Sequence, residues 1–272
     1  MKNKPNVQNV IIIAREAGDI LMHHRGQVTA EYKGDDSPVT IADKNASDHI
    51  INSLKEFTPD IPVVSEEQDM KTNRKIVKES ETYWMTDPLD GTKSYIEGYD
   101  GFGVHIALIH KGEPVMGVAF FPAQENCAGK LYYTGNNGKA YVQVGKTAPQ
   151  RIKVSKNPGV IKTAMGWKDR PAIETGEIIR AVGGARLCVT AEGPANLAQF
   201  NSSFSYWDVA AGHAIIKAAG GGFYNAKTLE EIRYDKPDLV TPPAFGGAKN
   251  FVKKLFYKRP PSPSNPKAPP KR

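Results

Sequence analysis

The sequence predicts a mixed α/β fold in which helices pack on an antiparallel sheet in the first half, while helices and strands mix in the second half. Three observations support this. Apolar residues recur at helical spacing near the N-terminus, two segments of alternating polarity flank the polar turn 111–113, and the second half sets apolar, Ala-containing helical stretches among short apolar runs. With 272 residues and 40% hydrophobic residues, the chain can form one large or two smaller domains with a sizeable core.

The elements of the first half follow in chain order. Apolar residues on one helix face predict a helix over 7–24, and a second helix is expected over 43–57. Two strands should follow, one leading into Glu66 and one ending at Asp87, where Pro88 and Gly91 turn the chain. The remaining strands are expected at 102–110 and 114–121, which read as a hairpin, and at 130–134, 139–144 and 150–154.

The second half alternates both types of element. A strand at 161–165, a helix at 185–192, a strand at 197–200 and a helix over 208–219 are expected, the last closed by the glycines 220–222. The composition changes most sharply at about Lys249. We therefore predict a folded body over 1–248, with subdomains of about 1–155 and 156–248, and a basic, proline-rich, disordered tail over 249–272.

The charge distribution argues against a nucleic-acid platform. The net charge is +7, but eight basic residues and no acid lie in 249–272, so the rest of the chain is close to neutral. We expect no specific nucleic-acid partner, and we interpret the tail either as a solubilising appendage or as a weak contact with an anionic membrane or RNA. Two isolated cysteines, Cys127 and Cys188, and no secretory or membrane-spanning stretch predict a reduced cytoplasmic protein with both thiols in its core.

Acidic residues at the ends of three predicted elements give the clearest functional signal. Glu66 follows a β-branched run, Asp87 and Asp90 flank Pro88 and Leu89, and Asp208 opens a predicted helix. A single Asp-x-x-Asp is common in surface turns, but three such elements can converge. Two carboxylates about 4 Å apart repel by roughly 4 kcal/mol at an effective dielectric near 20, so a converged cluster requires cations. Oxygen ligands suit Mg²⁺, which predicts a metal-dependent phosphatase.

These residues also carry a family resemblance. Asp87-Pro88-Leu89-Asp90-Gly91-Thr92, with 65–67 upstream and 207–214 downstream, resembles the signature motifs of the inositol monophosphatase superfamily over about residues 7–222. Segments 36–43 and 58–67, with Lys93, resemble its bacterial 3′(2′),5′-bisphosphate nucleotidase branch. The resemblance implies a layered α-β-α-β-α sandwich of the inositol monophosphatase and fructose-1,6-bisphosphatase type. It also implies hydrolysis of the 3′-phosphate of adenosine 3′,5′-bisphosphate to AMP and phosphate, in support of sulfate assimilation.

The same resemblance assigns roles to individual residues. It implies two or three Mg²⁺ ions and a phosphate held at the Gly91 and Thr92 amides. It also implies that Thr92, Asp43 and Glu66 orient and deprotonate the attacking water. The implied metal ligands are Glu66, Asp87, Asp90, Asp208 and the Leu89 carbonyl. The implied substrate-binding residues are Glu66, Leu89, Asp90, Gly91, Thr92, Arg186 and Asp208.

The substrate stays open at this point. The branch usually carries a Gly-Ser-Ser-Leu-Lys-like segment where this chain has residues 183–188, so an inositol phosphate or a sugar phosphate is the alternative. Arg186 is expected to clamp a second phosphate bidentately. Tyr206 or Trp207 can stack on a base or belong to the core, and the histidines of the two halves, His105 and His213, are expected to be structural.

An account of a different class also stays open: a noncatalytic protein that binds RNA or a membrane through its tail. The complete acidic set favours the phosphatase over this account. The chain is expected to be a monomer or a homodimer.

Overall fold

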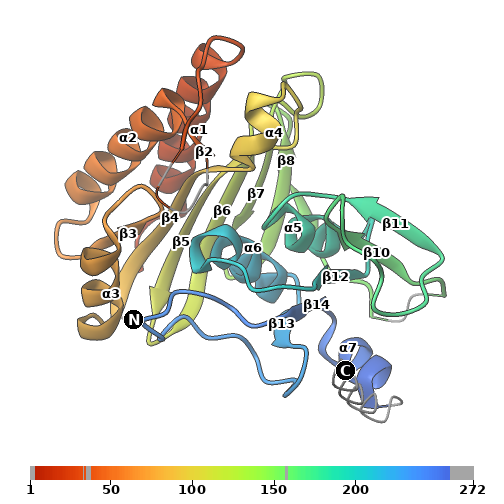
Figure 1. Cartoon of the computed structure of the whole chain (residues 1–272). Coiled ribbons are helices and arrows are strands. Elements are labelled where there is room, and N and C mark those ends of the chain that lie inside the picture. The colour runs from red at the N-terminus through yellow and green to blue at the C-terminus, as the bar shows by residue number, and fades with distance from the viewer. Residues whose placement is uncertain (1–3, 33, 35–37, 157–158, 258–272) are drawn as a thin grey trace, which may run out of the picture.

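The computed structural model describes residues 4–32, 34, 38–156 and 159–257, and in this part of the chain the strands form a seven-stranded, a five-stranded and a two-stranded sheet (Figure 1). The small sheet pairs β1 (Glu31–Tyr32) with β2 (Pro38–Val39). The helices pack on the two larger sheets.

The seven-stranded sheet runs in the order β3-β4-β5-β6-β7-β8-β9. Its strands are β3 (Val63–Ser65), β4 (Thr82–Asp90), β5 (Gly103–His110), β6 (Glu113–Phe121), β7 (Lys130–Thr134), β8 (Ala140–Val144) and β9 (Gln150–Ile152). All neighbours are antiparallel except β3 and β4, which are parallel. The predicted hairpin is confirmed as β5–β6. Its two turn residues, Lys111 and Gly112, both have positive φ, the conformation that a two-residue hairpin turn needs.

Both faces of this sheet are covered, because alternate residues of its strands are apolar on each side. Trp84, Ile106 and Val118 pack beneath α1 (Val7–His24) and α2 (Ile41–Phe57). Their strand neighbours Tyr83 and Ala107 face the opposite way, toward α5 (Ala185–Glu192) and α6 (Tyr206–Ala218). In Figure 1 the helices α1 and α2 lie on one side of the sheet and α6 on the other.

The five-stranded sheet lies beyond α5 and α6, in the order β11-β10-β12-β14-β13. Its strands are β10 (Lys162–Met165), β11 (Glu177–Arg180), β12 (Leu197–Phe200), β13 (Gly222–Asn225) and β14 (Ala244–Gly247). Strand β10 is parallel to β11 and β12, and the other pairs are antiparallel. Helix α7 (Lys249–Tyr257) packs against β14 and closes the outer side. The layers therefore follow the order α-β-α-β-α, as the family resemblance implied.

Several elements differ from the sequence predictions. Helices α2 and α6 each begin two residues earlier than predicted, and β4 does not end at Asp87 but continues to Asp90. The sequence analysis predicted no element at β1, β2, α3 (Met70–Glu79), β11, β13 or β14. Helix α4 (Thr92–Ile96) follows directly on Gly91.

The predicted tail also needs a correction at its start. Residues 249–257 form α7, because Phe251, Val252 and Leu255 share a helix face that packs on apolar residues of the smaller sheet. The rest of the tail, 258–272, lies outside the described residues, and the subdomain division stays a prediction. Cys188 is buried as predicted, whereas Cys127 is exposed in the loop after β6, which corrects its expected core position. No helix among the described residues has the length and apolar character needed to cross a membrane.

Candidate metal and phosphate site

Three acidic side chains from three elements converge at one edge of the larger sheet. Strands β3 and β4 run parallel with Ser65 opposite Thr86, so Glu66 and Asp87 follow side by side. The third acid, Asp208, lies in the first turn of α6. Carboxylate oxygens of Glu66, Asp87 and Asp208 all lie within 4.8 Å of one another. The convergence expected from the sequence is therefore present.

A bulge in β4 places Asp90 in the same region. In a regular strand, residues three apart point to opposite faces, but the pairing of β4 with β5 shifts register between Asp87 and Asp90. A hydrogen bond within the bulge stabilises it, because the Leu89 N–H donates to Asp87 Oδ1 at 2.9 Å. The prediction that β4 ends at Asp87 was wrong because the bulge lets pairing resume, with Asp90 opposite Gly103.

Asp90 lies against the backbone of residues 183 and 184. Its Oδ2 accepts a hydrogen bond from the Gly184 N–H at 3.2 Å. A Cβ atom at Gly183 would stand 2.2 Å from Asp90 Oδ1, and one at Gly184 would stand 2.3 Å from the Asp208 carbonyl oxygen. Two glycines are thus required here, because any side chain would collide with the acidic residues.

Mutual repulsion and burial perturb these acids. Burial, and next the neighbouring carboxylates, raise the pKa of Asp87 well above its ordinary value. The same two causes, in the same order, raise the pKa of Asp208. Burial also raises the pKa of Asp90, although His105 opposes the shift. An all-oxygen donor set whose anionic forms are destabilised by one another fits a hard cation, which would relieve the repulsion.

The predicted pair of Thr92 and Asp43 is in contact. The Thr92 hydroxyl lies 3.3 Å from Asp43 Oδ1 and 3.1 Å from the Leu89 carbonyl oxygen. Asp43 Oδ2 accepts hydrogen bonds from the Thr40 backbone N–H at 2.8 Å and from the Thr40 hydroxyl at 2.6 Å. Burial raises the pKa of Asp43 despite these hydrogen bonds. Gly91, which precedes Thr92, has φ +89°, and a Cβ there would meet the Gly101 carbonyl at 2.8 Å.

Both Asp43 and Asp208 occupy the third position of a helical capping box. Thr40 caps α2 and Ser205 caps α6, and in each box the aspartate accepts a hydrogen bond from the backbone N–H of the capping residue. The sequence analysis did not use this signal, although Thr-x-x-Asp and Ser-x-x-Asp are visible at both helix starts. The caps fix the direction in which each carboxylate points.

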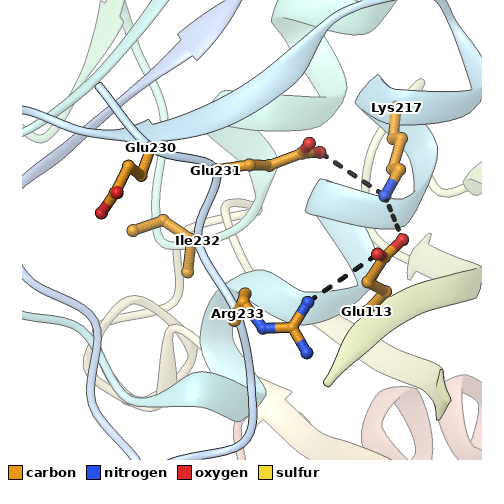
Figure 2. Close-up of a pocket in the computed structure, with 6 residues that line it drawn as sticks. All are labelled: Glu113, Lys217, Glu230, Glu231, Ile232 and Arg233. Atoms are coloured by element: carbon orange, nitrogen blue, oxygen red, sulfur yellow. Dashed lines mark hydrogen bonds and ion pairs between the residues drawn. The ribbon is translucent and has the colours of Figure 1, made fainter. Parts of the chain in front are cut away.

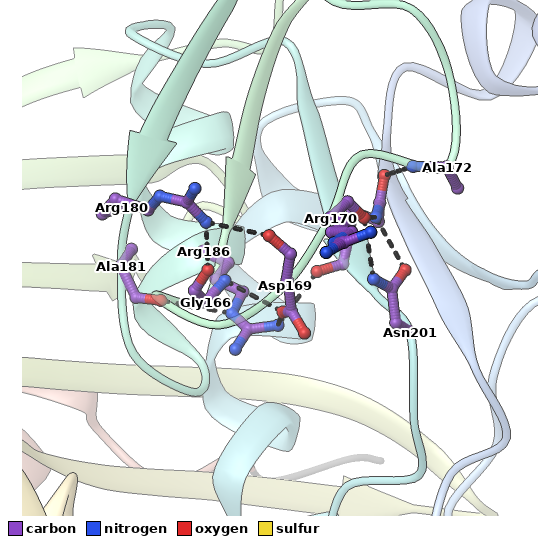
Figure 3. Close-up of polar contacts among 9 residues, drawn as sticks. Gly166, Asp169, Arg170, Ala172, Arg180, Ala181, Arg186 and Asn201 are labelled. Atoms are coloured by element: carbon purple, nitrogen blue, oxygen red, sulfur yellow. Dashed lines mark hydrogen bonds and ion pairs between the residues drawn. The ribbon is translucent and has the colours of Figure 1, made fainter.

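The guanidinium of Arg186 already forms hydrogen bonds with other groups of the protein (Figure 3). Its Nε donates to the Ala181 carbonyl at 3.2 Å, and its Nη1 donates to Asp169 Oδ2 at 3.1 Å and to the Gln199 carbonyl at 3.0 Å. Its guanidinium also lies 4.9 Å from the ring centroids of Phe200 and Phe204. A bidentate phosphate clamp would have to displace one of these acceptors, because either edge of the guanidinium includes Nε or Nη1. The substrate-binding role of Arg186 stays a prediction.

The histidines and aromatic residues differ in their positions. His213 is buried and lies 3.2 Å from Glu231 and 3.1 Å from the Tyr234 hydroxyl, as expected of a structural group. His105 is also buried, but it borders the site, with Nδ1 3.1 Å from the Asp208 carbonyl oxygen and Nε2 3.7 Å from Asp90 Oδ2. Tyr206 and Trp207 are both buried, so the core interpretation applies to them and stacking on a ligand does not.

Two hollows differ in their relation to these acids. One of about 850 Å³ is lined by α4, which begins at Thr92, by the loops around Tyr99 and Trp167, and by Arg186. The hollow in Figure 2 lies at Lys217, near the other end of α6 from Asp208, a distance of about 13 Å along the helix. There Lys217 and Arg233 pair with Glu113 and Glu231, so its charges are largely balanced. Of these two hollows, the first lies beside Thr92.

Comparison with known proteins agrees with this geometry. The family model described as the inositol monophosphatase family matches residues 5–243. The 3′(2′),5′-bisphosphate nucleotidase CysQ of Salmonella typhimurium is 36% identical over 239 residues, covering 82% of this chain and 93% of that protein. The fructose-1,6-bisphosphatase/inositol-1-monophosphatase of Aquifex aeolicus is 31% identical over 230 residues, covering 77% and 81%. The crystal structure of CysQ from Bacteroides thetaiotaomicron is 29% identical, with a TM-score of 0.75 and coverage of 89% and 96%.

Proposed function

Since this chain belongs to the inositol monophosphatase family, we propose that it is a Mg²⁺-dependent enzyme that hydrolyses the 3′-phosphate of adenosine 3′,5′-bisphosphate to AMP and phosphate. The family and the curated relatives make it a phosphatase that acts on phosphorylated substrates. We further propose that it removes the nucleotide left by sulfate assimilation. The observation that carries the proposal is the convergence of Glu66, Asp87 and Asp208 beside the connected pair of Thr92 and Asp43.

The acidic cluster would hold the cations. Glu66, Asp87 and Asp208 supply close oxygens, and Asp90 and the Leu89 carbonyl complete the proposed set for two or three Mg²⁺ ions. The chemistry that such ions supply is neutralisation of charge on the phosphate and a lower pKa of water. The donor atoms are all oxygens, as Mg²⁺ prefers.

We assign the proton transfer to side chains of the protein. We assign the Thr92 hydroxyl to accept a hydrogen bond from the attacking water while donating its own proton toward Asp43 Oδ1. Thr40 occupies Asp43 Oδ2, which leaves Oδ1 for this contact. Because burial raises the pKa of Asp43, its carboxylate is a better proton acceptor than an exposed aspartate. Glu66 orients the water, and the Gly91 and Thr92 amides face the phosphate.

The net reaction forms one bond and breaks one bond at phosphorus. Water oxygen bonds to phosphorus as the bond from phosphorus to the 3′ oxygen breaks. One water proton passes by way of Thr92 to Asp43, which later returns it to solvent, and the other stays on the phosphate. The 3′ oxygen leaves as a hydroxyl after taking a proton from solvent water. A mutation at Asp90 tests the assignment. We expect Asp90→Asn to lower phosphate release by about 100-fold or more, since it removes charge from the site while keeping the side-chain shape. Asp48→Asn, at an exposed acid of the same helix as Asp43, is the control and should retain full activity. A folded Asp90→Asn enzyme with undiminished activity would contradict the proposal.

One alternative substrate has its own support. The Aquifex aeolicus relative is named for fructose-1,6-bisphosphate and inositol 1-phosphate, so these esters stand as the second candidate. Phosphate release should be measured in parallel from adenosine 3′,5′-bisphosphate and inositol 1-phosphate, with Mg²⁺ and with chelator. A Mg²⁺-dependent preference for the nucleotide supports our proposal, whereas preference for the inositol ester would replace the substrate and leave the site unchanged. The alternative of a noncatalytic binding protein is set aside, because the family match and curated relatives identify an enzyme.

A further inference from the structure

We propose that the cleft beside the acids is a nucleobase site in which Tyr99 and Trp167 hold the base of a nucleotide substrate. This inference rests on the phosphatase function proposed above and adds the residues that distinguish a nucleotide from an ester without a base. Tyr99 and Trp167 act here as specificity-determining residues. They take no part in bond breaking.

The cleft lies next to Thr92, at one side of the acidic site. It has a volume of about 850 Å³, and its lining includes Lys93 and Ser94, which directly follow Thr92. Gly101, also in the lining, comes so close to Gly91 that a Cβ on Gly91 would stand 2.8 Å from its carbonyl oxygen. A substrate whose phosphate lies at Thr92 can therefore extend directly into the cleft.

Two large aromatic side chains from separate segments are exposed in this one cleft. Trp167 is 71% exposed and Tyr99 is 64% exposed, whereas Trp84 and Trp207 are buried. A single exposed aromatic is ordinary, but two beside a catalytic site match the apolar lining of a ligand pocket. Flat aromatic faces stack on bases of any sequence. The cleft thus offers a stacking surface for a base, which a nucleotide has and an inositol phosphate lacks.

The turn that carries Trp167 is rigidly held. Gly166 and Asp169 close it through two hydrogen bonds, from the Gly166 N–H to Asp169 Oδ2 at 3.0 Å and from the Asp169 N–H to the Gly166 carbonyl at 3.2 Å. Arg186 then binds Asp169 Oδ2, and Arg180 donates to the carbonyl oxygens of Gly166 and Asp169 (Figure 3). Trp167 and Lys168 occupy the two central positions of this turn. Arg186 therefore acts by positioning Trp167, which accounts for its engagement with protein acceptors.

The charges of the cleft suit a bisphosphate. Two of its acids are matched by arginines, Asp169 by Arg186 and Asp100 by Arg25. Its third acid, Glu97, lies 3.9 Å from Lys93, so each acid of the lining has a basic partner. Lys168 adds one further positive charge, which favours a second phosphate.

Tryptophan fluorescence tests the stacking directly. The chain has three tryptophans, and Trp167 is the exposed one, so AMP titrated into the Mg²⁺-loaded enzyme should quench emission through Trp167. We expect Trp167→Phe to lose most of this quenching while keeping the wild-type KM for adenosine 3′,5′-bisphosphate, because phenylalanine still stacks. Trp167→Ala and Tyr99→Ala should each raise that KM about 5- to 100-fold, with a much smaller change in kcat. Val160→Ala, at an exposed apolar residue outside the cleft lining, is the matched control.

The outcomes separate this inference from the proposed function. If the wild type hydrolyses the nucleotide and both alanine variants keep its KM, the nucleobase site is wrong and the phosphatase assignment stands. If the variants impair hydrolysis of inositol 1-phosphate to the same degree, the residues do not recognise a base and the inference fails. If the wild type hydrolyses only inositol 1-phosphate and AMP causes no quenching, both proposals fail.

Discussion

Asp87 combines deep burial with several carboxylate neighbours, and this combination makes its charge costly without a cation. Burial and the acids around it raise its pKa in the folded chain well above the ordinary value near 3.8. A raised folded pKa means that the native state binds more protons than the unfolded state, so the contribution to stability is present at low pH and is lost as pH rises through the folded pKa. The proposed metal site is therefore a source of instability that a bound cation would offset.

This instability predicts how Asp87→Asn behaves. In chelator at pH 7, the variant should have a larger free energy of unfolding than the wild type, because asparagine keeps the oxygen that accepts from the Leu89 N–H but carries no charge. The difference should shrink toward zero as pH falls to about 4, with a slope of up to about 1.4 kcal/mol per pH unit. Urea unfolding across this pH range measures it. Addition of Mg²⁺ at pH 7 should favour the wild type, and a wild type that is the more stable protein in chelator at every pH would refute the argument.

Gly183 provides a second test at the residue scale. Its missing side chain leaves space for the Asp90 carboxylate, which a Cβ would approach to 2.2 Å. Gly183→Ala should displace Asp90 by a fraction of an ångström or more and lower activity by about 100-fold, with far-UV circular dichroism unchanged. Gly159→Ala is the matched control, since a Cβ there meets no atom within 4 Å. Equal activity of the two variants would show that Asp90 tolerates the displacement.

The residues that sequence reasoning found and missed differ in where their neighbours lie. Asp87 and Asp90 stand within one short motif, and Glu66 and Asp208 each follow a recognisable pattern, so their convergence was predictable. Two of the partners of Arg186, Asp169 and Gln199, lie 17 and 13 residues away in sequence, so its engagement was not predictable. Trp167 gave no local signal for the same reason, because only the fold brings its turn to the cleft.

At the scale of elements, helix caps connect local structure to the proposed active site. The box at the start of α2 satisfies buried backbone N–H groups that the helix leaves unpaired, and it also fixes Asp43 toward Thr92. Thr40→Ala should cost about 1 kcal/mol of stability and also lower kcat, because Asp43 loses a hydroxyl partner. Asp69→Ala is a matched control, since Asp69 caps α3 through the N–H groups of Lys71 and Thr72. It should cost similar stability without loss of kcat. Equal kcat in both variants would mean that the α2 cap has no part in catalysis.

Prediction of elements succeeded where the pattern was long or sharply bounded. The helices α1 and α5 and the strand β12 match the predicted limits to the residue. Helix α3 was missed because it buries little apolar surface, with only Asn73 and Val77 buried. Strand β14 was missed because Gly246 and Gly247 are poor strand formers. They are accommodated because neighbouring atoms leave little room for side chains, with Leu187 beside Gly246 and Asn196 beside Gly247.

At the scale of the whole molecule, the order of layers explains where the site can form. The parallel pair β3 and β4 brings two acids to one edge of the larger sheet, and α6, packed between the sheets, brings the third. Close packing of this middle layer depends on Gly117 of β6, where a Cβ would stand 2.3 Å from the Ala211 carbonyl oxygen. The acids therefore meet only when the first three layers are assembled, and the distribution of apolar residues on both faces of β4 to β7 encodes that assembly.

The outermost layer gives the last prediction, because it separates α7 from the residues beyond it. Val252 of α7 is buried in a cluster with Leu197 and Phe245, so α7 covers the outer face of the smaller sheet. Removal of 258–272 should leave kcat, KM and the free energy of unfolding unchanged, whereas removal of 249–272 should lower that free energy by at least about 2 kcal/mol through exposure of this cluster. Val252→Ala in the full chain, expected to cost about 1–3 kcal/mol, tests the same contact without truncation. Chemical unfolding and phosphate release measure all three proteins. If the longer truncation is as stable as the shorter one, α7 contributes nothing to the fold and the layered body ends at β14.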